Sequence, residues 1–342
     1  MSMINLTLSF ALLGFVNVLF ANNNYHEFSQ NCMGARFRII LDHDNYELCR
    51  AAADQAFSEC NRLNEIFSDY SAESEVSRLS NSPITDKFLK VSDELFEVLT
   101  FSKQLAEKTN GAFDPTMGRV SRLWRIARYR KILPSDKALG IAMKNSGHKH
   151  LALDANFCGI NLKKPEVILD LGGIAKGYAA DKMLNKIKQA GIHRVLIDAG
   201  GDLVLGKAPR GKSGWTVEIG GRANFLLPTL NLQNCAIATS GDSEQFVEIE
   251  GVRYSHIFNP RTGYGLQDLS QVSVIAKNGM IADSYATTAL IIGCERTKEI
   301  LNTQKTPINA YFFEDDSLNP KISIIKNEYF SLDKIYEYPK VK

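Results

Sequence analysis

The segment VILDLGGIAKGYAADK, residues 167–182, contains two hydrophobic patterns in succession. The short apolar run that ends at Asp170, residues 167–170, predicts a strand, and the helical spacing of the apolar residues that follow predicts a helix that ends at Gly191. Glycines at such a junction let the backbone approach a ligand, and a helix N-terminus offers free N–H groups to a phosphate. The spacing is neither GxGxxG nor GxxxxGK[ST]. The alternative is a tight structural turn that carries a surface lysine, Lys176.

Segments on both sides of this junction extend the mixture of strands and helices. Residues 35–41 (ARFRIIL) predict a strand, and apolar residues at helical spacing predict helices over residues 48–67 and 92–110. Further along, RVLIDAGGDLVLG reads as a strand broken by two glycines, residues 215–219 alternate as a strand with one wet face, and QVSVIA is another short strand. Because strands and helices do not alternate strictly, the sequence predicts an α+β fold.

Composition and charge limit the classes of function that remain. The chain has 342 residues, 44% of them hydrophobic and 23% charged, and 40 Lys and Arg balance 38 Asp and Glu. A net charge of +2 creates no field that would draw nucleic acid or an acidic membrane surface to the protein. The function is therefore expected to depend on a defined site. Because the sequence has no internal repeat, low-complexity tract or Pro-rich linker, it predicts one domain over residues 22–342, with an arrangement in two lobes left open.

The N-terminus predicts export from the cytoplasm. Residues 10–21 form an apolar stretch that is too short to span a bilayer and suits the core of a secretory signal, so we expect a signal peptide over residues 1–21 with cleavage after Ala21. The segment before this stretch has no Lys or Arg. An uncleaved membrane anchor and a buried terminal strand are the alternatives.

The segment GMIADSYATTALIIG, residues 279–293, is an apolar helix that carries two oxygen donors. Asp283 and Thr287 are four residues apart and lie on one helical face. Carboxylate and hydroxyl oxygens suit Mg²⁺, and a backbone carbonyl from the glycine turn could add a third ligand. The alternative is that Asp283 caps its own helix and Thr287 bonds back to a helix carbonyl.

The segment SHIFNPRTGYG, residues 255–265, presents a histidine beside a turn. His256 precedes a Pro-Arg-Thr-Gly turn, which suggests a titratable imidazole next to a rigid loop and so a general base. A half-buried histidine bonded to the backbone is the alternative.

Taken together, these segments resemble a known family. Eight motifs occur in the order found in the ApbE family of FAD:protein FMN transferases: MGARFRI, SDYSAESEVSRL, GAFDPTMGRVSRLW, DLGGIAKGYAADK, IDAGGDLVLG, ATSGDSEQF, SHIFNPRTG and ADSYATTALIIG. They span residues 33–293. The resemblance implies a T-fold-like α+β enzyme, with mixed or antiparallel sheets packed with helices, that is usually exported. For this chain we expect a periplasmic or extracytoplasmic location, or association with the inner membrane through an uncut signal.

The resemblance also implies a reaction and its partners. An ApbE enzyme uses Mg²⁺ to cleave the FAD pyrophosphate, attaches FMN through a phosphoester to a Thr or Ser hydroxyl of a target protein, and releases AMP. Expected acceptors are proteins such as subunits of membrane redox complexes, and nucleic acid is not a partner. An FAD pyrophosphatase that gives FMN and AMP, and a non-catalytic flavin-binding or delivery protein, are the alternatives.

Position by position, the resemblance assigns roles to residues of this chain. Gly173, through its carbonyl, together with Asp283 and Thr287 would hold the metal, and His256 would be the base that deprotonates the acceptor hydroxyl. The residues expected to contact FAD are Met33, Tyr70, Ala112, Phe113, Asp114, Asp170, Lys176 and Ile257.

The chain departs from the family pattern at two places. Residues 33–35 read MGA where the family commonly has MGT, and residues 240–243 read SGDS where it commonly has SGDY. A hydroxyl and an aromatic ring are therefore missing near the expected flavin pocket, although neither change touches the expected metal ligands. The balance between transfer to protein and hydrolysis of FAD is left open.

Overall fold

A computed structural model of the chain describes residues 25–83, 85–219, 227–241, 246–268, 270–314, 321–326 and 336–338. The expected signal peptide, residues 1–21, lies outside these described residues.

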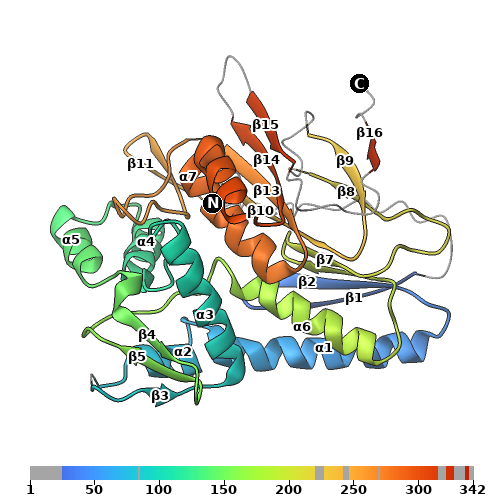
Figure 1. The fold of residues 1–342 in the computed structure, drawn as a ribbon, viewed down its shortest axis with the longest axis horizontal. Helices are drawn as coiled ribbons and strands as arrows, with labels where there is room; N and C mark the ends of the chain where they lie inside the picture. Colours follow the sequence, from blue (N-terminus) through green and yellow to red (C-terminus); the bar gives the residue numbers. More distant parts are fainter. Residues whose placement is uncertain are drawn as a thin grey trace, which may run out of the picture.

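An eight-stranded antiparallel sheet forms the centre of the fold (Figure 1). Its strand order is β1-β2-β6-β7-β10-β13-β14-β15, and every neighbouring pair is antiparallel. The strands are β1 (Tyr25–Cys32), β2 (Ala35–Asp42), β6 (Val195–Ala199), β7 (Leu203–Leu205), β10 (Ala236–Gly241), β13 (Ser270–Ala276), β14 (Asn309–Glu314) and β15 (Lys321–Ile325).

Both faces of this sheet are buried, and the strands alternate between two apolar cores. In β2, Ile39 and Leu41 face the core that includes the helices, whereas Ile40 faces the opposite core. The first core packs against α1 (Tyr46–Phe67), α6 (Ala175–Gln189) and α7 (Gly279–Gln304), with α6 in contact with both other helices. The second core is covered by a small sheet of order β16-β9-β8, made of Tyr336–Tyr338, Thr229–Leu232 and Trp215–Glu218.

A second group of elements lies beside the large sheet (Figure 1). It contains the three-stranded sheet β3-β5-β4, the hairpin β11-β12 and the helices α2 to α5. A third apolar core that includes Trp124 lies between α4, α5 and the hairpin, whereas the buried residues of α2, α3, β4 and β5 belong to the first core. The elements are α2 (Glu75–Ser80), β3 (Leu89–Lys90), α3 (Asp93–Lys108), α4 (Gly118–Arg130), α5 (Asp136–Lys144), the 3₁₀ turn His148–His150, β4 (Leu151–Asp154), β5 (Gly159–Leu162), β11 (Phe246–Ile249) and β12 (Val252–Ser255).

The predicted α+β fold is confirmed, with one wrong element. Residues 167–170 do not form a strand, since only Ile168 makes an isolated bridge, to Met117. The neighbouring polar groups bond to a loop and a side chain instead: Asp170 N–H donates to the Pro115 carbonyl and Leu169 N–H donates to Ser80 Oγ. The apolar run therefore crosses between elements rather than joining a sheet.

The N-terminal ends of α6 and α7 cross at a pair of glycines. A Cβ placed on Gly177 would lie 2.1 Å from the Gly279 carbonyl oxygen, and a Cβ placed on Gly279 would lie 2.4 Å from the Gly177 carbonyl oxygen. These distances are shorter than any real contact of a Cβ, so the two backbones can approach this closely only because both residues lack a side chain. The crossing therefore determines where the polar side chains of each helix lie relative to the start of the other helix.

We expect Gly279→Ala to destabilise the fold. The added methyl group would also lie 2.8 Å from Val204 Cγ2, and overpacking of this kind typically costs about 1–3 kcal/mol. Thermal unfolding of the ligand-free protein measures the effect. Gly140→Ala is the matched control, because Gly140 is exposed in α5 with open space around its Cβ position and should gain slightly in stability. Equal melting temperatures for Gly279→Ala and the wild type would contradict the tight crossing.

Candidate active site

The two helices at this crossing cap each other through aspartates. Asp181 of α6 accepts hydrogen bonds from the backbone N–H groups of Gly279 (2.7 Å) and Met280 (2.9 Å) at the start of α7. Asp283 of α7 accepts one from Gly177 N–H in the first turn of α6 (3.0 Å). The N-cap of α7 is Asn278, so the alternative in which Asp283 caps its own helix is wrong. Each carboxylate instead faces the positive end of the neighbouring helix dipole.

Thr287 lies at the junction of the glycine turn, α7 and strand β10. Its Oγ1 is 3.2 Å from Ser240 Oγ, and a Cβ placed on Gly173 would lie 3.1 Å from the same hydroxyl oxygen. The threonine that bonds back to a helix carbonyl is the next one, Thr288, whose hydroxyl donates to Ser284 O at 2.7 Å. The structure thus brings Gly173 against Thr287, one helical turn along α7 from Asp283.

A lysine and two aspartates determine the charge around this junction. Lys176 Nζ forms an ion pair with Asp202 Oδ2 at 2.6 Å. Burial, then the charge of Asp202, raises the pKa of Asp283 to about 7, while Lys176 opposes the rise. Burial alone would lower the pKa of Lys176, but Asp202 and Asp283 outweigh it and the pKa is raised. One ammonium therefore faces two carboxylates, which favours an additional cation.

The donors at this junction fit Mg²⁺. Asp283 is buried and supplies a carboxylate, and Thr287 supplies a hydroxyl beside the backbone of Gly173. Hard oxygen donors of this kind suit Mg²⁺, which keeps several water ligands and needs few protein ligands. Among the residues that the structure describes, no three His, Cys, Asp or Glu side chains gather into a metal-binding group, so any metal here would depend on this mixed set. Asp202, two residues after the first glycine of IDAGGD, was missed by sequence reasoning.

Arg125 joins the predicted contacts Tyr70 and Asp170. Its guanidinium bonds Asp69 through Nη1 (2.6 Å) and Nη2 (3.1 Å), and Nη2 is 3.5 Å from Asp170 Oδ2. The same guanidinium lies 4.0 Å from the centre of the Tyr70 ring. Asp170 Oδ1 accepts from Gly172 N–H at 2.8 Å, so this cluster continues into the glycine turn. Sequence reasoning missed Arg125 and Asp69, although Arg125 directly follows the motif that ends at Trp124.

The segment 112–114 lies beside the glycine turn, and its three residues have different surroundings. Ala112 and Phe113 are buried, and a Cβ on Gly173 would be 3.4 Å from a ring carbon of Phe113. Asp114 holds a loop: its Oδ1 accepts from the Thr116 hydroxyl at 2.6 Å and its Oδ2 accepts from His148 N–H at 2.7 Å. Direct contact of Asp114 with a flavin nucleotide stays a prediction.

Three predicted site residues occupy turns. Met33 lies in the two-residue turn between β1 and β2, where it and Gly34 both have positive φ (49° and 74°). His256 and Ile257 follow β12, and both are half-buried.

The loop after His256 and Ile257 is held in place, as the sequence predicts. Asn259 O accepts from Gly263 N–H at 2.7 Å, and Trp124 Nε1 donates to Gly263 O at the same distance. The role of His256 stays a prediction. Of the unusual SGDS segment, Asp242 and Ser243 lie outside the described residues.

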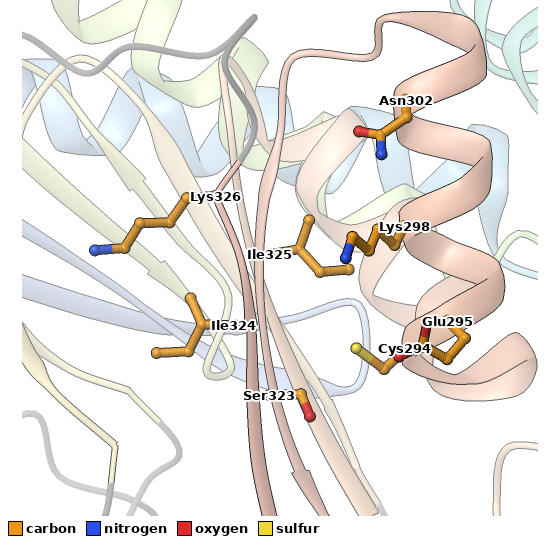
Figure 2. Close-up of a pocket in the computed structure, with 8 residues that line it drawn as sticks. All are labelled: Cys294, Glu295, Lys298, Asn302, Ser323, Ile324, Ile325 and Lys326. Carbon is orange, nitrogen blue, oxygen red and sulfur yellow. The ribbon is translucent and has the colours of Figure 1, made fainter.

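A surface cavity of about 860 Å³ lies elsewhere on the molecule (Figure 2). It opens between β15 and the part of α7 that follows Gly293, where the helix is interrupted by a residue with φ 75°. Cys294 and Lys298 project from α7 towards Ser323 and Ile325 of β15. None of the predicted site residues lines this cavity, so it is separate from the α6–α7 crossing.

Comparisons with known proteins agree on the class of this chain. It is 28% identical over 301 residues to an FAD:protein FMN transferase of Klebsiella pneumoniae, covering 85% of this chain and 90% of that protein, and 29% identical over 260 residues to one of Vibrio cholerae, covering 74% and 77%. The solved structure of the flavin transferase ApbE from Vibrio cholerae matches with a TM-score of 0.76 at 26% identity, covering 88% of this chain and 97% of that one. The ApbE protein of Thermotoga maritima matches with a TM-score of 0.77 at 27% identity, covering 89% and 97%.

These likenesses define the chain as an enzyme of the transferase class, with an α+β fold of helices packed on antiparallel sheets. A family model described as the ApbE family matches residues 33–312. The chain belongs to the ApbE family. Within the described part of the chain, no helix has both the length and the apolar character needed to cross a membrane.

The carboxyl group of Asp181 is expected to make the stability of the fold depend on pH. Burial raises the pKa of Asp181 from the ordinary 3.8 to about 6, against the opposing effect of the Gly279 and Met280 N–H groups. The folded state therefore holds this proton more tightly than the unfolded state. The contribution of protonated Asp181 to the stability of the folded state is complete below about pH 4 and is lost as pH rises through 6.

We expect the free energy of unfolding of the wild type to fall, relative to that of Asp181→Asn, by roughly 3 kcal/mol from pH 4 to pH 7. The figure follows from the pKa shift of Asp181 at about 1.4 kcal/mol per pKa unit. Urea unfolding at a series of pH values measures it. Asp86→Asn, at an exposed site, is the control and should track the wild type. A constant difference for Asp181→Asn would show that Asp181 titrates normally.

Proposed function

We propose that this protein transfers FMN from FAD to a Thr or Ser hydroxyl of a target protein, with release of AMP and a requirement for Mg²⁺. The observation that carries the proposal is the grouping of Gly173, Asp283 and Thr287 beside Lys176 at the start of α6. The name of the Klebsiella pneumoniae and Vibrio cholerae relatives, FAD:protein FMN transferase, supports the same reaction.

The residues at the crossing suit a pyrophosphate. Lys176 supplies a positive charge at the first turn of α6, whose N-cap, Ile174, has no capping side chain. The positive end of a helix dipole is favourable for phosphate oxygens, although the N–H groups of Ala175 and Gly177 already donate to Leu171 O and Asp283. Asp283, Thr287 and the carbonyl of Gly173 would hold Mg²⁺. When bound, the ion would stabilise the negative charge on the pyrophosphate oxygens.

The proposed transfer exchanges one phosphorus–oxygen bond for another. The acceptor hydroxyl oxygen forms a bond to the phosphorus of the FMN half, and the bond from that phosphorus to the bridging oxygen breaks. AMP leaves with the electron pair of that bond. The proton of the acceptor hydroxyl passes to a base, for which His256 is the candidate because a neutral hydroxyl is a weak nucleophile. Lys176 would balance charge that develops on the leaving group.

The partners of the reaction follow from the same proposal. Met33, Tyr70, Ala112, Phe113, Asp114, Asp170, Lys176 and Ile257 are the proposed FAD contacts. The acceptor is a protein with an exposed Thr or Ser, for which subunits of membrane redox complexes are candidates. Residues 1–21 suggest that the enzyme works outside the cytoplasm.

A single incubation tests the proposed reaction. The purified protein, FAD, Mg²⁺ and a protein that carries the family's Thr/Ser acceptor sequence should give a covalently fluorescent acceptor in a denaturing gel, together with AMP. Chelation of the metal should remove the fluorescence. Rapid release of FMN and AMP without any acceptor would favour an FAD pyrophosphatase. FAD that stays intact with acceptor and Mg²⁺ would favour a delivery protein and reject the transferase.

Two neighbouring threonines give a matched test of the metal ligands. Thr287→Val removes a hydroxyl at the proposed site, so we expect the Mg²⁺ concentration for half-maximal transfer to rise by about tenfold or more. Thr288→Val removes a hydroxyl that only bonds back to Ser284, and should leave this concentration unchanged. Asp283→Asn should lower the transfer rate by roughly 100-fold or more. Identical Mg²⁺ dependence in Thr287→Val and Thr288→Val would reject Thr287 as a ligand.

A further inference from the structure

Tyr70 is an unusual surface residue because its ring is exposed on one side and supported on the other. The residue is 77% exposed, the largest exposure among the predicted site residues that are large and hydrophobic. The Arg125 guanidinium lies 4.0 Å from the ring centre, within the range of a cation–π contact. An exposed tyrosine without such support would sample several rotamers. Here one face of the ring packs on a planar cation and the other face is free to stack.

Arg125 is itself fixed by two carboxylates from different segments. Asp69 accepts hydrogen bonds from both Nη atoms of Arg125, and Asp170 accepts a longer one from Nη2. The three side chains are mostly shielded, with exposures of 22% for Arg125, 9% for Asp69 and 17% for Asp170. A planar guanidinium with paired donors loses little freedom in such a geometry, which a lysine cannot reproduce. Arg125 therefore joins α4 to the segment after α1 and to the glycine turn.

The charges in this cluster make Arg125 necessary for the placement of both aspartates. Burial, followed by the charge of Asp170, raises the pKa of Asp69, and Arg125 opposes this rise. Without the guanidinium, two shielded carboxylates would face each other with only the weaker effect of Arg122 to oppose their repulsion. Asp170 would then lose the contact that fixes its Oδ2, although its Oδ1 would still accept from Gly172 N–H.

We propose that Arg125 is a positioning residue for the dinucleotide: it holds the Tyr70 ring as a stacking platform and orients Asp170 at the entry to the glycine turn. The inference rests on the proposed function for the identity of the ligand, and it adds a residue outside the eight proposed FAD contacts. A platform of this kind recognises a flat aromatic ring. FAD offers two such rings, adenine and isoalloxazine, and stacking geometry suits either.

The test is the affinity for FAD, measured by calorimetry without Mg²⁺ and without acceptor. Arg125→Gln should raise the Kd for FAD by about tenfold or more, and Arg125→Lys should recover only part of the loss. At saturating FAD, the transfer rate of both variants should stay within about threefold of the wild type. Arg128→Gln is the matched control on the same helix, since Arg128 has no ion pair or hydrogen bond within the described part of the chain, and it should leave the Kd unchanged.

A double-mutant cycle separates positioning from a general structural effect. Because Arg125 acts partly through Tyr70, the loss in the double variant with Tyr70→Ala should be clearly smaller than the sum of the two single losses. Thermal unfolding of each variant checks the fold, and the cycle can be run with Arg125→Lys if Arg125→Gln is unstable. Additive losses, or a Kd for FAD that Arg125→Gln leaves unchanged, would overturn the inference.

Separate titrations with ADP and with FMN identify the ring that stacks. A loss of affinity for ADP alone assigns the adenine half to the Tyr70 platform, and a loss for FMN alone assigns the isoalloxazine half. If neither affinity changes in Arg125→Gln, the platform does not bind a ring and the inference fails. Binding of FAD with no transfer to any acceptor would count against the proposed function, while the affinity measurements on Arg125 would stand.

Discussion

The close approach of Gly177 and Gly279 is the constraint on which the candidate site depends. Because neither residue has a Cβ, the first turns of α6 and α7 lie near enough for each helix to supply the carboxylate that caps the other. Asp283 is thereby held at the start of α6, next to Lys176 and the glycine turn. The same contact that joins two core helices also places a buried negative charge where a divalent cation would fit.

Much of the fold follows from local patterns in the sequence. The apolar residues at helical spacing in 48–67 form α1, and the alternation from Trp215 to Glu218 gives a strand with one buried face. The two glycines after Ala199 turn the chain between β6 and β7. The segment 167–170 could not be predicted correctly from its own residues, because its backbone partners lie in the loop around Pro115 and on Ser80, far away in the sequence.

The residues proposed as metal ligands could be picked out from the sequence, whereas the residues that hold them in place could not. Asp283 and Thr287 could be found because four-residue spacing on an apolar helix is visible in the sequence. The role of Asp181 as the cap of a different helix depends on a tertiary crossing, and no local pattern encodes it. Arg125 is similar: its partners Asp69 and Asp170 are 56 and 45 positions away, so only the folded chain shows that one guanidinium serves both.

The turn between β1 and β2 shows how demands on one position can conflict. Both turn residues have positive φ, a conformation that Gly, Asn and Asp adopt readily and that is uncommon for a long side chain. Met33 adopts this unfavourable left-handed backbone conformation, and its thioether side chain packs at the edge of the first core. Sequence selection for hairpin stability alone would favour asparagine there. Thermostabilised variants chosen only by their melting temperature would thus tend to lose this methionine, and with it a side chain proposed to contact FAD.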